Sequence, residues 1–177
     1  MPTSWLAFPL SAAAATVVPA VVGMVNFPPN YMNVLGKKIA VCGEITGTAT
    51  AATIIDIQMQ WDANGQNTAG KGVLIGDFTV TPSAALASTG HASFCEEFET
   101  TVASASATGG SINHTGGFLG AAGVTVAGSG GGGDVVTPGA IGSLNLADSA
   151  RINVIYLHTT ATDGAGWILQ NLTVKQI

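Results

Sequence analysis

The fold class is decided by the C-terminal stretch, which runs Arg151-Ile-Asn-Val-Ile-Tyr-Leu-His158, then Thr162-Asp-Gly-Ala-Gly166, then Trp167-Ile-Leu-Gln-Asn-Leu-Thr-Val-Lys-Gln-Ile177. The first and last runs are rich in β-branched and apolar residues, which favour strands, and an Asp-Gly loop separates them. The pattern predicts a β-hairpin. Apolar strands need partners in a sheet, so we expect the other apolar runs of the chain to pair with this hairpin.

The composition is unusually poor in charge. Charged residues make up 8% of the 177 residues and hydrophobic residues 47%, whereas charged residues are about a quarter of an ordinary globular protein. A monomer with so few charges would be poorly soluble, so we expect much of the surface to be buried against other chains. The net charge is −5, and no basic stripe is available for phosphate groups, which excludes a nucleic-acid-binding protein.

The chain divides into two expected units, residues 1–35 and residues 36–177. The first unit carries no Lys or Arg, so it lacks the positive region of a signal peptide. Its prolines interrupt any helix long enough to span a membrane; they are Pro2, Pro9, Pro19, Pro28 and Pro29. We expect an extended, proline-containing N-terminal arm, packed on its own domain or on a neighbouring subunit, and no membrane segment.

Alternating apolar residues predict further strands in the second unit. Ile39, Val41 and Ile45 share one face, and the run Thr53–Trp61 places Ile55, Ile57, Met59 and Trp61 inward with Asp56, Gln58 and Gln60 outward. Val73–Val80 and His91–Val102 continue the pattern, the latter with Phe94, Phe98 and Val102 in register. No stretch has helical periodicity. The chain is therefore predicted to be all-β, an antiparallel β-sandwich of jelly-roll type with an extended N-terminal arm.

The titratable residues give no catalytic or metal-binding pattern. His91, His114 and His158 are scattered, and no spacing typical of zinc ligands joins them to a cysteine. Glu96 and Glu97 point to opposite sides of a strand, whereas Glu97 and Glu99 share a face that we expect to be solvated or subunit-facing. We therefore predict no catalytic residues, no metal and no cofactor.

A hydrolase is the enzyme hypothesis that deserves comparison. His158 and Asp163 flank the predicted hairpin loop, but no Gly-x-Ser-x-Gly motif or other nucleophile accompanies them. We therefore expect the protein not to be an enzyme.

Cys42 and Cys95 are too few for a disulfide framework. Each lies in an apolar run, so two small buried hydrophobic residues are the favoured interpretation and a disulfide is the alternative.

Four segments together resemble the β-sandwich virion proteins of tailed bacteriophages; they are Asn33–Gly47, Thr53–Trp61, Phe94–Val102 and Leu169–Val174. The pattern covers roughly residues 33–177. The resemblance implies a structural role as a capsid decoration or cement protein that binds the major capsid protein, commonly as a trimer. It also implies a location on the capsid surface of the virion, after assembly in the cytoplasm of the bacterial host.

Aromatic and large apolar residues are common at the centre of protein interfaces. For a decoration protein, the candidate attachment residues are therefore those of the N-terminal arm, which are Trp5, Leu6, Phe8, Phe27 and Tyr31. Packing against the protein's own core is the other interpretation of these residues, and it is at least as good for Phe27 and Tyr31.

The alternative function is a receptor- or glycan-binding module of a phage head fibre or tail accessory protein. Jelly rolls often bind sugars on an aromatic platform flanked by polar loop residues. Trp167 and Asp163 are the candidates for such a platform, with Asn64 and Gln66 as further polar residues. Trp61 completes an inward-facing alternation, which favours a core position.

Overall fold

The computed structural model describes residues 4–9, 20–47, 55–63, 72–82, 90–106, 108–122, 124–128, 140–158 and 167–177. These residues form strands and connecting turns and contain no helix, so no membrane-spanning helix occurs among them. The strands are β1 (Ser4–Pro9), β2 (Ala20–Phe27), β3 (Lys38–Gly47), β4 (Ile55–Ala63), β5 (Val73–Pro82), β6 (Gly90–Val102), β7 (Gly110–Ala122), β8 (Val124–Gly128), β9 (Ala140–Leu144), β10 (Ala150–His158) and β11 (Trp167–Gln176).

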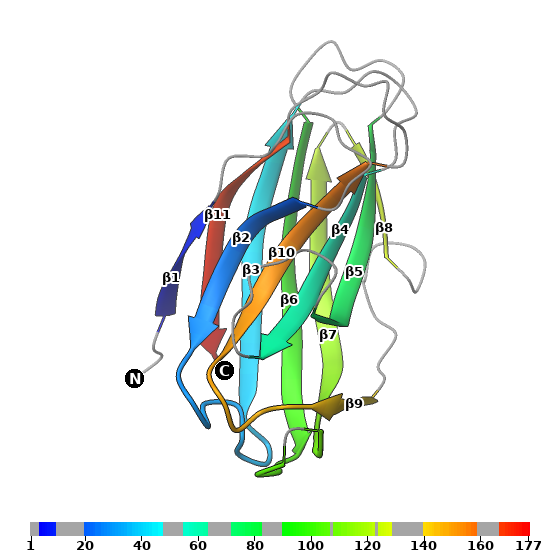
Figure 1. Ribbon diagram of the computed structural model, residues 1–177. Coiled ribbons are helices and arrows are strands. Elements are labelled where there is room, and N and C mark those ends of the chain that lie inside the picture. The colour runs from blue at the N-terminus through cyan, green and yellow to red at the C-terminus, as the bar shows by residue number, and fades with distance from the viewer. Residues whose placement is uncertain are drawn as a thin grey trace.

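The strands form two antiparallel sheets, as expected for a β-sandwich (Figure 1). The first sheet, sheet A, has the order β1-β11-β3-β6-β7-β9, and the second, sheet B, has the order β8-β5-β4-β10-β2-β1. Strand β1 belongs to both sheets, because its residues 4–7 pair with β11 and its residues 8–9 pair with β2. On the opposite side, β7 ends in sheet A and β8 begins two residues later in sheet B.

The predicted C-terminal hairpin is wrong, although both of its strands exist. Strand β10 pairs with β2 and β4 in sheet B, whereas β11 pairs with β1 and β3 in sheet A. Residues 159–166 between them are outside the described residues, but a segment of this length can cross the roughly 10 Å between two packed sheets. Each strand thus has both edges paired with strands distant in sequence, which satisfies more backbone groups than one hairpin pairing would.

The predicted N-terminal arm is not confirmed as a unit separate from the sandwich. Its described parts include β1 and β2, which are members of the sheets, and β2 pairs with β10 over most of its length. Its other described part, residues 28–35, lies in the connection to β3. Residues 1–3 and 10–19 of the expected arm are outside the described residues.

The apolar alternation read from the sequence places the core correctly in β3 and β4. Ile39, Val41 and Ile45 are fully buried, as are Ile57, Met59 and Trp61. The inward faces of the two sheets pack against each other. One example is Phe78 on β5 and Phe94 on β6, whose ring centroids are 5.1 Å apart. Burial of such faces is the main stabilising contribution to the fold.

Val102 departs from the predicted pattern. Phe94 and Phe98 are buried as expected, but the Val102 side chain is 48% exposed. The pairing of β6 with β7 has a register shift between Thr100 and Val102. A bulge of this kind inserts an extra residue, so the alternation of sides changes before Val102 is reached.

The favoured interpretation of the two cysteines is also wrong, because Cys42 and Cys95 form a disulfide. They lie directly opposite each other on β3 and β6, on the outer face of sheet A, and both are only half-buried. The two cysteines are 53 residues apart in the sequence. Their proximity follows only from the pairing of β3 with β6, which the sequence pattern did not predict.

Candidate functional site

The connection between β2 and β3 is held firmly at one end of the sandwich. We call its residues 28–37 the β2–β3 loop. Gly36 N donates to Thr100 O (2.8 Å), and Thr100 N donates to Lys37 O (2.9 Å). The buried Thr100 hydroxyl donates to Met32 O over 2.6 Å. The loop is therefore fixed to the end of β6.

Two further loops contact the β2–β3 loop at the same end. Ser104 N donates to Asn33 Oδ1 (2.7 Å), and Asn30 N donates to Ala147 O (3.0 Å). The turn that contains Ala147 is closed by Asn145, whose Oδ1 accepts hydrogen bonds from Ala147 N and Asp148 N. Three loops thus form one hydrogen-bonded end of the molecule.

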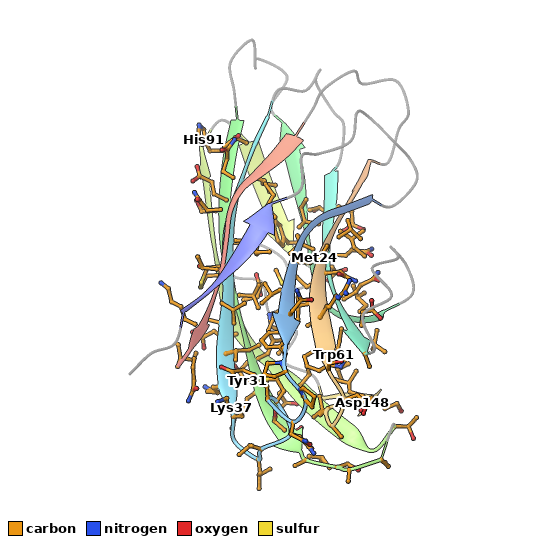
Figure 2. All side chains as sticks on the ribbon, turned by 60° about the vertical axis from the view of Figure 1, so that its left-hand side comes forward. Met24, Tyr31, Lys37, Trp61, His91 and Asp148 are labelled. Atoms are coloured by element: carbon orange, nitrogen blue, oxygen red, sulfur yellow. A yellow bond between two sulfur atoms is a disulfide. The ribbon has the colours of Figure 1, made fainter. Side chains whose placement is uncertain are left out.

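An aromatic stack joins this end to the core. Phe27 lies between Tyr31 and Trp61, with ring centroids 5.4 Å and 5.8 Å away. Trp61 Nε1 donates to Asn145 O (2.9 Å). Lys37 Nζ lies 4.3 Å from the centre of the Tyr31 ring and donates to Gln176 Oε1. Figure 2 shows Tyr31, Lys37, Trp61 and Asp148 at this end, and His91 at the other.

Apolar side chains project from this well-ordered end. Val34 is 55% exposed and Leu35 is 71% exposed, both in the β2–β3 loop, and the exposed Val102 follows Thr100 on β6. Ile177, also exposed, follows β11 and donates its N–H to Lys38 O. We call Val34, Leu35 and Val102 the apolar tip. Single exposed apolar residues are ordinary, but several on adjoining hydrogen-bonded segments are typical of contact surfaces.

The structure separates the candidate attachment residues into two groups. Phe27 is buried and Tyr31 packs against the core, which is the own-core packing that the sequence left open for them. Trp5, Leu6 and Phe8 lie in β1, opposite Val174, Thr173 and Met24 respectively. Their side chains are outside the described residues, so their role in attachment stays a prediction.

The candidate glycan platform is not brought together by described residues. Trp167 opens β11, opposite Gly47, but its side chain is outside the described part, as are Asp163, Asn64 and Gln66. Trp61 is 3% exposed, which confirms the predicted core position.

A pair of titratable side chains lies between the two sheets, where sequence reasoning did not place one. Glu96 on β6 and His114 on β7 are both buried, and a Glu96 carboxylate oxygen contacts His114 Nε2. The His114 ring stacks on Phe98 with centroids 5.1 Å apart. The prediction that Glu96 and Glu97 point to opposite sides is confirmed, since Glu97 is half-exposed.

Burial of Glu96 dominates its electrostatics. Loss of hydration raises the pKa of the carboxyl above its ordinary value, while the hydrogen bond and charge of His114 lower the pKa and the charge of Asp77 raises it. A similar loss of hydration raises the pKa of Asp56 in β4. Glu44 and His91 form a second Glu–His contact on the surface, where Glu44 Oε1 lies 2.8 Å from His91 Nδ1.

The sequence contained one usable signal for these sites. Glu96 alternates with Phe94 and Phe98, so the period of two could have identified its carboxyl as inward-facing, although this was not among the expectations from the sequence. The contact of Glu96 with His114 could not be predicted in this way, because it depends on the pairing of β6 with β7. The exposure of Leu35 could not be read from a loop without periodicity.

No group of three or more His, Cys, Asp or Glu side chains converges as a metal site in the described ranges. Comparisons with protein-family models, curated proteins and solved structures found no match to this chain.

Proposed function

We propose that this protein is a structural component of a tailed-bacteriophage virion. In this proposal it decorates and stabilises the capsid by binding the major capsid shell as an oligomer, most simply a trimer. The observation that carries the proposal is the apolar tip, because Val34 and Leu35 are exposed on a loop whose backbone is fixed by hydrogen bonds. A preorganised apolar surface binds a partner without a large loss of conformational entropy.

The strand pairing supports the jelly-roll topology that such proteins often have. The pairs β4 with β5, β3 with β6, β2 with β10 and β1 with β11 are nested in the sequence. A long antiparallel ribbon folded over on itself produces this order, and wrapping the ribbon into two sheets produces a jelly roll. We therefore assign these eight strands to a jelly roll, with β7, β8 and β9 as additions at its side.

The low charge supports association with other chains. Only 15 of the 177 residues are Lys, Arg, Asp or Glu. Some of these lie in side-chain pairs among the described residues, which are Lys38–Glu99, His91–Glu44 and His114–Glu96. A lattice of capsid sites would make each modest apolar contact effective, because neighbouring contacts act together.

Capsid binding by a single-residue variant tests the proposal. Leu35→Asp places a charge at the apolar tip without altering a buried side chain, and we expect it to lower binding to empty capsids of the cognate phage at least tenfold in co-sedimentation. Leu74→Asp is the matched control, since Leu74 on β5 is 44% exposed and lies outside the tip. Wild-type protein that does not bind capsids, or equal binding by both variants, would contradict the proposal.

A further inference from the structure

The disulfide between Cys42 and Cys95 faces away from the core. It joins β3 and β6, which are both interior strands of sheet A. Val41 and Phe94, the residues that precede the two cysteines on their strands, are buried in the core, whereas both cysteines are only half-buried on the outer face. A small thiol in solution therefore has access to the bond without entering the core, and access is one of the conditions for thiol–disulfide exchange.

The pairing of β3 with β6 does not depend on this bond. Every residue of β3, Lys38–Gly47, has a partner on β6 in one continuous register. On the inner face, Ile39, Ile45 and Phe98 are buried in the core. Backbone hydrogen bonds and apolar packing on both sides of the cysteines hold the two strands together when the bond is broken. We therefore expect the reduced chain to keep the sandwich and to keep its two thiols opposite each other.

The row of residues across sheet A decides which sulfur is attacked. A thiolate attacks a disulfide sulfur in line with the bond that breaks, from the side away from the leaving sulfur. On that side of Cys42 the neighbouring position is Thr173 on β11, and on that side of Cys95 it is Phe118 on β7. Threonine is the smaller residue, and the Thr173 side chain is partly exposed. The approach to Cys42 is therefore the wider one.

We propose that Cys42 and Cys95 form a thiol–disulfide exchange site for small thiols, which attack at Cys42 while the protein stays folded. In a reducing cytoplasm the folded chain then carries two thiols, and in an oxidising medium it carries the bond. The exchange does not depend on capsid binding. For a protein assembled in a host cytoplasm, as in the function proposed above, the bond would close after release from the cell.

Reduction takes two successive attacks by thiolates. In the first, an external thiolate bonds to Cys42 Sγ, the bond between the two Sγ atoms breaks, and its electron pair leaves with Cys95, which takes a proton from solvent. In the second, another thiolate attacks the external sulfur of the mixed disulfide and releases Cys42, which is protonated in turn. Two external thiols become one disulfide, and both cysteines are reduced. Oxidation by glutathione disulfide is the reverse sequence.

The first test follows reduction of the folded protein by dithiothreitol without denaturant. Wild-type protein is oxidised with glutathione disulfide, mixed with dithiothreitol and quenched with iodoacetamide, and mass spectrometry counts the alkylated cysteines. We expect both Cys42 and Cys95 to become alkylated at a rate proportional to the dithiothreitol concentration, with the circular dichroism of the β-sheet retained. A rate independent of dithiothreitol would mean that the bond is reached only by unfolding. That result, or loss of the circular dichroism on reduction, would overturn the proposal.

The variant Thr173→Tyr tests the direction of attack. A larger side chain at this position obstructs the approach to Cys42 Sγ, so we expect reduction to become several-fold slower. Gln170→Tyr is the matched control, because it places the same side chain at an exposed position of the same strand, and it should keep the wild-type rate. Equal rates in all three proteins would rule out attack at Cys42. If Thr173→Tyr does not fold, the dithiothreitol dependence of the wild type still decides whether the folded protein exchanges.

Discussion

Close packing at Gly43 gives a sharp prediction for one residue. A Cβ atom at this position would lie 2.5 Å from Phe94 Cζ and 2.7 Å from the backbone oxygen of Asn171. The backbone oxygen cannot move without disturbing the pairing of β3 with β11. We expect Gly43→Ala to lower the free energy of unfolding by about 1–3 kcal/mol, measured by urea denaturation.

Gly142 on β9 is the matched control, because a Cβ there would meet nothing within 4 Å. Gly142→Ala should change the free energy of unfolding by no more than about 0.5 kcal/mol. Equal effects of the two substitutions would show that the close approach at Gly43 does not exist.

Thr100 holds the loop that carries the apolar tip. Its side chain is completely buried, and its hydroxyl donates to Met32 O over 2.6 Å. Thr100→Val keeps the shape but leaves this carbonyl oxygen without its donor, so we expect a loss of about 1–2 kcal/mol in unfolding free energy. Hydrogen exchange at the Gly36 amide, which bonds to Thr100 O, should become faster. Unchanged exchange would mean that the hydroxyl does not fix the loop.

The inward or outward direction of a side chain was predictable from the sequence where the two-residue alternation of one strand determines it. The inward positions of Ile57, Met59 and Trp61 followed from strict alternation in one strand. The packing of Phe27 against both Tyr31 and Trp61 did not, because it depends on how the β2–β3 loop closes over the end of the sandwich.

At the scale of strands, the disulfide between β3 and β6 should contribute strongly to stability. It closes a loop with a sequence separation of 53 residues, for which the chain-entropy model gives about 4 kcal/mol. We expect the double variant Cys42→Ala/Cys95→Ala to lose stability of this order in urea denaturation. Thiol titration of unreduced, denatured protein should find no free thiol at these positions. Two free thiols per chain would contradict the assignment.

Strand existence was predictable, but strand pairing was not. Propensity and alternation identify runs such as Arg151–His158, because they depend on neighbouring residues. The choice between a hairpin and two separate sheets depends on competition among all available edges, which no local pattern contains. For the same reason the opposition of Cys42 to Cys95 and the contact of Glu96 with His114 became visible only with the register of β6.

At the scale of the whole molecule, the described strands of the N-terminal segment, β1 and β2, are part of the sandwich. Strand β1 pairs with both sheets, and β2 covers an edge of β10. Removal of residues 1–32 would therefore delete two strands, and loss of binding by such a truncated protein would not distinguish attachment from unfolding. Point substitutions at the apolar tip avoid this difficulty because they leave the strand pairing unchanged.

The central claim, that this charge-poor sandwich is an oligomer that binds the capsid shell through its apolar tip, is tested most directly by sedimentation of the wild type and Leu35→Asp, each alone and mixed with capsids. We predict that both proteins alone are oligomers of the 17.6 kDa chain, most simply with three times that mass, and that Leu35→Asp binds capsids at least tenfold more weakly than the wild type with unchanged circular dichroism. A wild-type protein that remains monomeric at high concentration, or a variant that binds capsids as strongly as the wild type, would contradict the claim.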